Sequence, residues 1–282
     1  MWENRSKLIF GSCMLIASLM FFQMGMYTMH VLAGWDVKYN VIQFCHTAIR
    51  SLGVTWAGYI LNGIVFHTLL LTVWIAAKQL YLSRAFYKRL LFCRHEELTR
   101  QICEQHGGGH PSITVVRSPA PMAFAAGFWK PQIVLSTGLL ELLDPSELEA
   151  VIHHETFHRK HGDPLKIFLL SLLASVMWYL PILKSFHQNY KIVREILADN
   201  YAIDKLGGSA DLGGALLKLL KGQTPANLSI SHVSFTDTSI NFRIRKLLEP
   251  QSELPLKWPF TPAMISVQAM LALCSMFIVV MH

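Results

Sequence analysis

Residues 144–164 read DPSELEAVIHHETFHRKHGDP, a stretch in which the start and the end of one helix are both marked. Its Asp-Pro-Ser-Glu opening is an aspartate version of the capping box, with Asp144 as the N-cap and Glu147 as its partner. Gly162 is suited to the left-handed conformation that commonly ends a helix. The sequence therefore predicts a helix from residue 145 to about residue 161.

This predicted helix carries His154-Glu155-Thr156-Phe157-His158, an HExxH motif. Residues four apart differ by only about 40° around a helix, so both imidazoles can bind a single zinc ion. Glu155 then lies beside the open position of the metal, where it can take a proton from the attacking water. A polar helix face without a metal is the alternative, although apolar neighbours such as Val151 and Ile152 make it an unusual one. We predict one Zn2+ per chain and Glu155 as general base.

A catalytic zinc takes three protein ligands, so a third ligand has to be found elsewhere. Metzincins would supply a His where this chain has Pro164, which excludes that class. His161 shares nearly the same face as His154 and is one candidate. Glu195 is the better one, since it lies on a later predicted helix with Asp199 on the same face, where Asp199 could orient a zinc-bound His. A solvated acidic helix face is the alternative interpretation of this pair.

The composition points to lipid. Of 282 residues 52% are hydrophobic and 15% are charged, whereas a soluble globular chain carries about a quarter charged residues. Three uncharged runs, Leu8–Ala33, Ser51–Ala77 and Trp258–Met281, are each long enough to span a bilayer, which takes about 20 helical residues. We predict two transmembrane helices in the region 1–83, at about 8–33 and 54–77, and a C-terminal one in the region 256–282.

A fourth apolar run, Ile167–Leu183, is interrupted by Pro181 and is too short to cross. We predict a membrane-dipping helical hairpin at about 165–190, with a buried core helix as the alternative. Basic residues are more frequent in the N-terminal tail and after the second span than in the loop 34–50, which predicts a cytoplasmic central region. The expected location is therefore a bacterial cell membrane, crossed several times.

The central region 84–255 is predicted to be an α+β domain, a small β-sheet beside a helical bundle. It should begin with a helical segment that ends near His106, before a run of glycines. Short β-type runs follow at Ser112–Arg117, Met122–Ala126 and Gln132–Ser136. Further helical runs are predicted at 188–206 and 210–221.

Two other classes are excluded by composition. Five cysteines without a CxxC pair support neither a disulfide scaffold nor a cysteine-based zinc knuckle. The net charge of +7 comes mostly from a basic collar beside the second predicted span, and no basic face is interleaved with stacking aromatics. We expect contact with the lipid bilayer and no direct binding of nucleic acid.

Taken together, the motifs between about residues 112 and 250 resemble those of the integral-membrane gluzincin peptidases. The resemblance is greatest to the protease domain of the BlaR/MecR antibiotic sensors, with kinship to the HtpX and CAAX prenyl protease family. The residues that carry it are Pro131-Gln132-Ile133-Val134-Leu135, Glu147-Leu148, His154-Glu155-x-x-His158 with Asp163, Trp178-x-x-Pro181, Glu195-x-x-Ala198-Asp199 and Arg243-Ile244-x-x-Leu247-Leu248.

This resemblance implies roles for individual residues. It implies that the zinc ligands are His154, His158 and Glu195, that the base is Glu155, and that Asp163 and Asp199 are supporting residues. It also implies that an extended substrate pairs with an edge strand formed by Gln132, Ile133, Val134, Leu135 and Ser136. For the oxyanion donor, the candidates are Tyr201, His232 and Arg243, and none of them is preferred.

The expected activity is that of a membrane-embedded zinc metalloendopeptidase that cleaves cytosolic or membrane-associated proteins. The resemblance favours regulatory proteolysis, such as cleavage of a cytosolic transcriptional repressor. The alternatives are HtpX-like quality control of membrane proteins and a non-catalytic transducer that keeps the protease fold. The chain stops at His282 without the penicillin-binding domain of BlaR/MecR receptors, so we expect a separate sensor protein to supply the signal.

Overall fold

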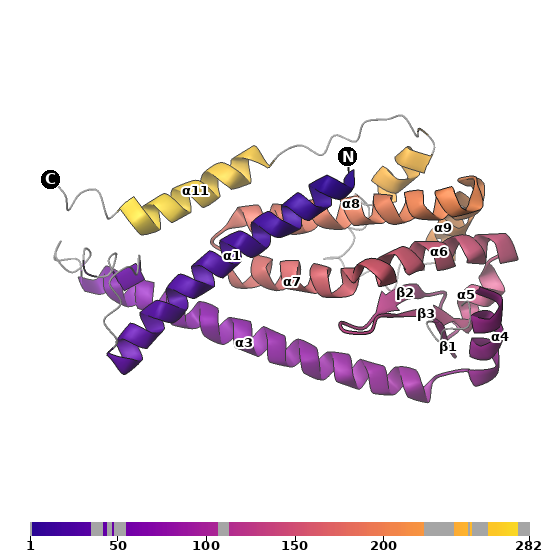
Figure 1. Cartoon of the computed structure of the whole chain (residues 1–282), viewed down its shortest axis with the longest axis horizontal. Coiled ribbons are helices and arrows are strands. Elements are labelled where there is room, and N and C mark those ends of the chain that lie inside the picture. The colour runs from indigo at the N-terminus through magenta and orange to yellow at the C-terminus, as the bar shows by residue number, and fades with distance from the viewer. Residues whose placement is uncertain are drawn as a thin grey trace. The chain divides into compact units, whose positions relative to one another are not determined.

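The computed structural model describes residues 2–34, 42–43, 47, 55–106, 113–222, 240–247, 249 and 259–275 (Figure 1). The chain divides into two compact units, each built from separate segments. Unit 1 contains Met1–Ser6, Tyr81–Phe168 and Asn189–Leu256, and unit 2 contains Lys7–Leu80, Leu169–Gln188 and Lys257–His282. Most described residues are helical and the sheet is small, so the domain predicted as α+β is dominated by its helices.

Unit 1 contains the three predicted strands in one sheet. They are β1 (Ile113–Val116), β2 (Ala123–Ala126) and β3 (Gln132–Ser136). The strand order is β1-β3-β2, with β1 parallel to β3 and β2 antiparallel to it.

The position of β3 corrects one prediction. Gln132, Ile133, Val134, Leu135 and Ser136 were expected to form an edge strand that receives substrate, but both sides of β3 are already paired. Four of the five residues are buried, as is typical of a strand covered on both faces. Among the described residues, the free edge next to the HExxH helix belongs to β2.

Four helices surround this sheet, and its apolar core lies between them. They are α4 (Glu96–His106), α5 (Thr137–Leu142), α6 (Pro145–His161) and α9 (Ala210–Gly222). α6 packs on β2 and β3 and also on α9, while α4 packs against β1. The core side chains come from every one of these elements except β2, whose Ala123 is partly buried against them.

The bounds of α6 confirm the helix predicted from the capping pattern. Its start is fixed by Glu147, whose Oε2 accepts a hydrogen bond of 2.9 Å from the backbone N–H of Asp144. Its end is fixed by Gly162, which has the left-handed conformation at φ 61° and ψ 34°. On α9, a Cβ at Gly214 would come within 2.6 Å of Oε1 of Glu147, so a side chain there would displace the carboxylate of the capping box.

The apolar run after α6 forms a helical hairpin. Its first arm is α7 (Asp163–Val176) and its second is α8 (Pro181–Leu206), joined by a tight turn at 177–180. The second arm starts at Pro181, earlier than the predicted start at residue 188, because proline is suited to the first turn of a helix. α8 then continues without a break to the segment that carries Glu195.

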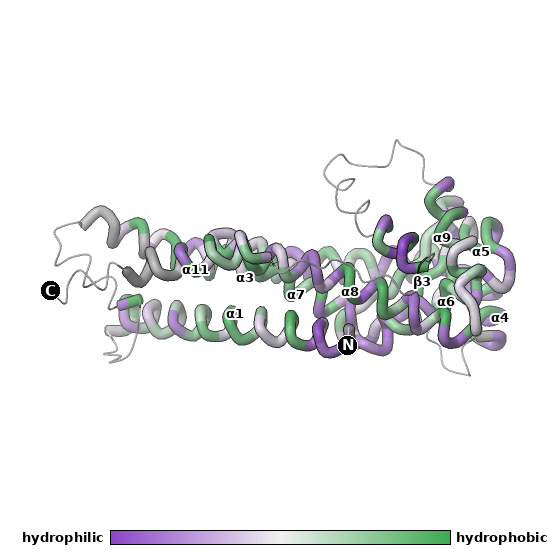
Figure 2. The backbone as a smooth tube through the Cα atoms, turned by 90° about the horizontal axis from the view of Figure 1, so that it is seen from above, coloured by the Kyte–Doolittle hydropathy of each residue, from purple (hydrophilic) through white to green (hydrophobic). Residues whose placement is uncertain are grey.

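Two helices, most of whose residues belong to unit 2, are long and apolar enough to cross a membrane. They belong to α1 (Trp2–Ala33) and α3 (Thr55–Phe92), with the second candidate span at Asn62–Leu90. Many of their exposed side chains are apolar, for example Leu15 at 72% exposure and Leu70 at 70%, as expected for contact with lipid. Figure 2 shows hydrophobic residues recurring along α1. α3 runs through the expected boundary at residue 83, so the second span and the start of the central region form one helix.

The third predicted span lies partly outside the described residues. Within it the structure describes α11 (Phe260–Ser275), a helix of 16 residues. Ser266 on this helix accepts a hydrogen bond of 3.0 Å from the backbone N–H of Ile182. Tyr179, in the turn of the hairpin, packs against a cluster of Met24, Tyr27 and Val65 from α1 and α3. Unit 2 therefore groups the turn of the hairpin with the apolar helices.

Candidate metal centre

Two imidazoles on α6 face one another. His154 and His158 lie one turn apart and are both buried, and their Nε2 atoms are 3.2 Å apart. The centroids of the two rings are 4.9 Å apart at an interplanar angle of 71°. The spacing of four residues thus brings both rings to one point, as the sequence predicted.

Glu195 on α8 completes a group of three. Its carboxylate oxygens are 3.6 Å from Nε2 of His154 and 3.6 Å from Nε2 of His158. One atom from each of the three residues lies within 4.8 Å of the others, which is close enough to hold one metal ion. His161, the alternative third residue, lies outside this group, since its Nδ1 is 2.8 Å from the backbone oxygen of Phe157.

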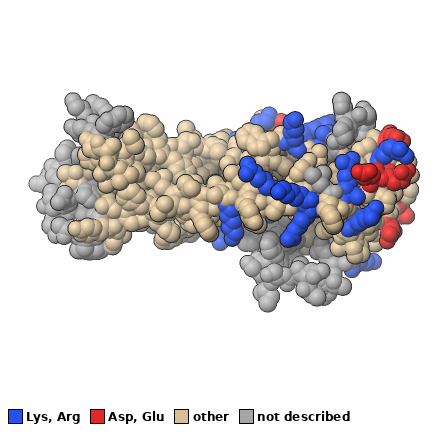
Figure 3. Space-filling model, turned by 90° about the horizontal axis from the view of Figure 1, so that it is seen from below, with Lys and Arg blue, Asp and Glu red and all other residues tan. Residues whose placement is uncertain are grey.

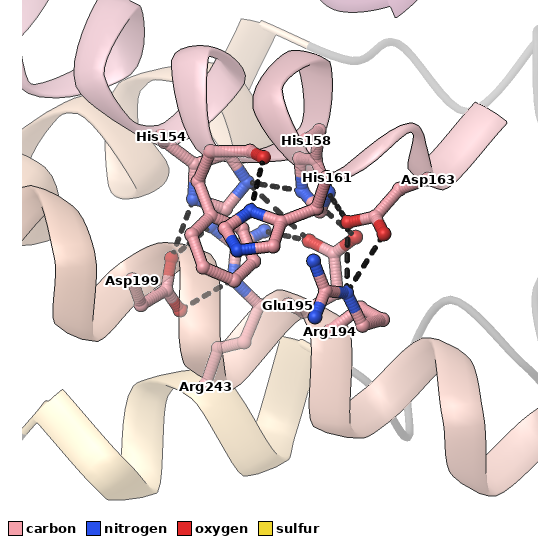
Figure 4. A network of polar contacts seen from close by, with 9 residues as sticks. His154, His158, His161, Asp163, Arg194, Glu195, Asp199 and Arg243 are labelled. Atoms are coloured by element: carbon pink, nitrogen blue, oxygen red, sulfur yellow. Dashed lines mark hydrogen bonds and ion pairs between the residues drawn. The ribbon is translucent and has the colours of Figure 1, made fainter. Parts of the chain in front are cut away.

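Two aspartates contact the outer nitrogens of the imidazoles (Figure 4). Nδ1 of His154 is 2.9 Å from Asp199, and Nδ1 of His158 is 2.8 Å from Asp163. Because a carboxylate accepts a hydrogen bond, each Nδ1 carries the proton in the neutral ring, and each Nε2 keeps its lone pair. Two Nε2 lone pairs facing each other at 3.2 Å would repel, so the arrangement needs a cation between them, either a metal ion or a proton on one of the rings.

An arginine contacts each of these aspartates in turn. Arg194 donates from Nε to Asp163 at 2.9 Å and stacks on the ring of Phe157 at 4.4 Å. Arg243, from the helical residues 240–247, donates two hydrogen bonds of 2.8 Å to Asp199. Its third nitrogen is 3.2 Å from Glu195, so this guanidinium joins a supporting carboxylate to a prospective ligand.

The charges of this cluster shift the pKa values of its members. Burial opposes the protonation of His154, but hydrogen bonds to Asp199 and Glu195 outweigh it and raise the pKa of this ring to about 10. Burial likewise disfavours the charged form of Glu195, yet the hydrogen bond with His154 and the charge of Arg243 hold its pKa far below the usual range. In the metal-free protein a proton on His154 therefore compensates the carboxylates.

A cavity of about 370 Å³ is lined by this cluster. Glu155 lines the same cavity as His154 and His158. On the side of the sheet, the lining includes Ala123, Phe124 and Ala125 of β2. A carboxylate, a prospective metal site and a free strand edge thus border one cavity, which suits hydrolysis of an extended polypeptide.

Sequence reasoning did not identify two parts of this site. Arg194 was seen only as the residue before Glu195, although a charged residue inside an apolar helix pattern often signals a buried partner. β2 was missed as a lining element because its small residues carry no chemical signal. Of the three oxyanion candidates, only Arg243 lines the cavity; Tyr201 bonds to Lys160 instead, and His232 lies outside the described residues.

Comparison with known proteins gives related proteases. The chain is 38% identical over 88 residues to protease HtpX homolog 2 of Methanosarcina mazei, which is 30% of each protein. It is 31% identical over 137 residues to the protease HtpX homolog of Archaeoglobus fulgidus, covering 47% of this chain and 41% of that one. Protease HtpX of Thioalkalivibrio sulfidiphilus is 36% identical over 76 residues, or 26% of each. The chain thus spans less than half the length of these relatives.

A match to a family model covers more of the chain. The model described as BlaR1 peptidase M56 matches residues 38–247, which include both helices of the metal centre and the whole sheet. The family match and the similarity to HtpX proteases both indicate a membrane peptidase. The chain therefore belongs to the BlaR1 peptidase M56 family of membrane metallopeptidases.

Proposed function

We propose that the chain is a zinc-dependent endopeptidase of the membrane that hydrolyses peptide bonds in cytosolic or membrane-associated proteins. The observation that carries this proposal is the pair of facing nitrogens, 3.2 Å apart, on His154 and His158. A tetrahedral zinc with Zn–N distances of about 2.0–2.1 Å separates two ligand nitrogens by about 3.3 Å. With Glu195 as third residue, the donor set of two imidazoles and a carboxylate is one that catalytic zinc sites use.

Each residue around the cavity then has a distinct task. Zinc, when bound, supplies a Lewis acid that polarises the scissile carbonyl and the attacking water. Glu155 accepts the proton of that water and returns it to the leaving amine. Asp199 and Asp163 hold the Nδ1 protons, so that both Nε2 lone pairs remain directed to one point. Arg243 offsets the negative charge of Glu195.

An extended substrate is expected to pair with β2 instead of β3. Ser136 donates its N–H to the carbonyl of Met122 at 3.0 Å, which makes these two residues a hydrogen-bonded pair. From there, non-hydrogen-bonded and hydrogen-bonded residue pairs alternate along the antiparallel strands β2 and β3. By that alternation the main-chain groups of Ala123 and Ala125 point to the free edge. Ala125→Pro removes one outward N–H without removing a bond to β3, and should abolish cleavage while zinc stays bound. Ala125→Val, which keeps the N–H, is the matched control.

Two kinds of substrate are compatible with this site. One is a cytosolic transcriptional repressor cleaved in regulated proteolysis, with a separate sensor protein providing the signal, as the resemblance to the BlaR/MecR sensors implies. The other is a membrane protein cleaved in quality control, the alternative suggested by the similarity to proteases named HtpX. Strand pairing reads main-chain atoms, so in both cases we expect a flexible stretch of several residues and no strict requirement for one side chain.

The zinc domain is proposed to lie in the cytoplasm. The support is the excess of Lys and Arg around α3, of which Arg84, Lys88 and Arg89 are exposed. A cysteine introduced at Gln188 should then escape an impermeant thiol reagent on intact cells. Labelling at Gln188 but not at Glu97 would mean that the hairpin crosses the bilayer, which would separate Glu195 from α6.

The proposal is tested by zinc content and by hydrolysis together. The full-length protein in lipid nanodiscs should contain about one zinc per chain and should cleave a fluorescently labelled unfolded protein. His158→Ala should lose most of the zinc, whereas Glu155→Gln should keep the zinc and lose hydrolysis. Full zinc content in His158→Ala would overturn the ligand assignment, and turnover by Glu155→Gln would overturn the role of the base.

A further inference from the structure

The loop between β2 and β3 exposes an aromatic side chain next to a basic one. Trp129 is 88% exposed, and Lys130 beside it is exposed as well. In Figure 1 this loop projects from the end of the sheet opposite α4 and α5. Trp is enriched at the membrane–water interface, and Lys near the interface can extend its charged group toward water and lipid headgroups.

Two aromatic contacts tie this hairpin to helices that continue into apolar segments. Phe128, next to Trp129, stacks on Phe168 with 5.1 Å between the centroids and 24° between the planes. Phe168 directly precedes the apolar part of α7, which belongs to unit 2. At the strand itself, Phe124 contacts Phe86 at 5.9 Å, and Phe86 lies on α3 within its candidate span. The loop is therefore held close to two points where the chain turns apolar.

The charge around these points suits phospholipid headgroups. α3 exposes a series of basic side chains near Phe86, namely Lys78, Arg84, Lys88 and Arg89. Figure 3 shows Lys and Arg side chains gathered on the visible face, while most of the Asp and Glu side chains lie toward one end of it. Lys130 adds one more positive charge from the sheet. Anionic lipid attracts such clusters of basic residues electrostatically.

From these contacts we propose that the β2–β3 loop is a membrane-interface anchor, with Trp129 inserted at the level of the phospholipid headgroups. Lys130 lies beside it and faces lipid phosphates. Because the loop continues directly into β2, insertion brings the free edge of this strand to the bilayer surface. Extended segments that emerge from the bilayer would then reach the cavity without leaving the surface. The inference rests on the membrane location of the chain and does not require that it hydrolyses peptides.

Photocrosslinking of the full chain in nanodiscs tests the anchor. The probe is p-benzoylphenylalanine, introduced in place of Trp129 or, as a control, in place of Asp204, which is exposed on the last turns of α8. The discs contain phosphatidylethanolamine and phosphatidylglycerol. We expect an adduct with the mass of one phospholipid at position 129 and at least a tenfold lower yield at position 204. Adducts should form equally in the Glu155→Gln background, which separates this result from the test of hydrolysis.

Tryptophan fluorescence provides a second measurement without the probe. Lipids with brominated acyl chains should quench the wild-type protein more than Trp129→Phe, while aqueous iodide should quench the two alike. Equal lipid adducts at both positions would overturn the proposal, as would stronger iodide quenching of the wild type than of Trp129→Phe. An adduct at position 129 with an added polypeptide, and none with lipid, would overturn it in favour of direct contact with substrate.

Discussion

Two chains of polar contacts support the two imidazoles, and they differ in what else they touch. One runs from His158 to Asp163 and Arg194, and its last two residues are only 1% and 3% exposed. It is built from α6, α7 and α8, which follow one another in the sequence. The other runs from His154 through Asp199 to Arg243, which comes from the later segment 240–247 and also contacts Glu195.

This difference separates a structural role from a tuning role. In the first chain of contacts, Asp163 is the counter-charge of a buried arginine that also stacks on Phe157, so the fold itself depends on it. In the second, Arg243 divides its hydrogen bonds and charge between Asp199 and the prospective ligand Glu195. Loss of one partner there leaves the guanidinium with the other. Both imidazoles thus have a carboxylate beside Nδ1. We expect loss of Asp163 to affect mainly the stability of the fold, and loss of Asp199 to affect mainly the affinity for metal.

Asp163→Ala should have the largest effect. It leaves Arg194 buried without a counter-charge, and breaking a buried pair in this way costs about 3–5 kcal/mol. We expect loss of the folded domain or a large fall in its unfolding temperature, measured by thermal scanning of the detergent-solubilised protein. Glu97→Ala, which removes an exposed pair with Arg100, is the control and should change stability by less than about 0.5 kcal/mol. An Asp163→Ala protein as stable as the control would remove the structural role.

Asp199→Ala should mainly weaken metal binding. Removal of a carboxylate that orients a ligating imidazole lowers metal affinity by about 10- to 100-fold. The unfolding temperature of the metal-free protein should fall far less than in Asp163→Ala, since Arg243 keeps its contact with Glu195. Competition with a zinc chelator gives the affinity. Equal stability losses in both variants would mean that the two chains of contacts are equivalent.

The comparison also indicates which features the sequence could predict. The ends of α6 depend on groups within a few residues, the capping box of Glu147 and the glycine at 162, so they could be identified locally. The pairing of His154 with His158 follows from helical geometry in the same way. The ion pair of Arg194 with Asp163 links residues 31 positions apart, on the two arms of the helical hairpin, and no local sequence pattern specifies it.

The wrong edge strand has a similar cause. Whether β3 is central or at an edge depends on parallel pairing with β1, which is separated from it by β2 in the sequence. The continuous apolar run Ile133–Leu135 was nonetheless a signal, since strands covered on both faces lack the alternation of an edge strand. The continuity of α3 could also have been inferred, because the sequence from 64 to 92 contains no proline or glycine.

The third prediction is that the protein releases a proton when it binds zinc. His154 has a pKa of about 10 in the metal-free protein, because its hydrogen bonds to Asp199 and Glu195 outweigh burial. It is therefore protonated at pH 7, and it must lose that proton to become a ligand. Titration calorimetry in buffers of different ionisation enthalpy should give about one proton released at pH 7. Apparent affinity should rise about tenfold per pH unit from there and level off above about pH 10. Affinity that is flat from pH 6 to 8 would contradict the charged state of His154.

Arg243→Lys should have the smallest effect of the four. Lysine keeps a positive charge near Glu195, but it cannot reproduce the two parallel hydrogen bonds that the guanidinium donates to Asp199. We expect zinc affinity to fall about threefold and kcat to fall by a similar factor at saturating zinc, with KM unchanged, because the residue acts through the ligands. Arg243→Gln, which removes the charge as well, should lower both the zinc affinity and kcat further. If the two variants lost affinity equally, the hydrogen bonds to Asp199 would matter and the charge beside Glu195 would not. A rise in KM alone would instead mean that Arg243 contacts the substrate.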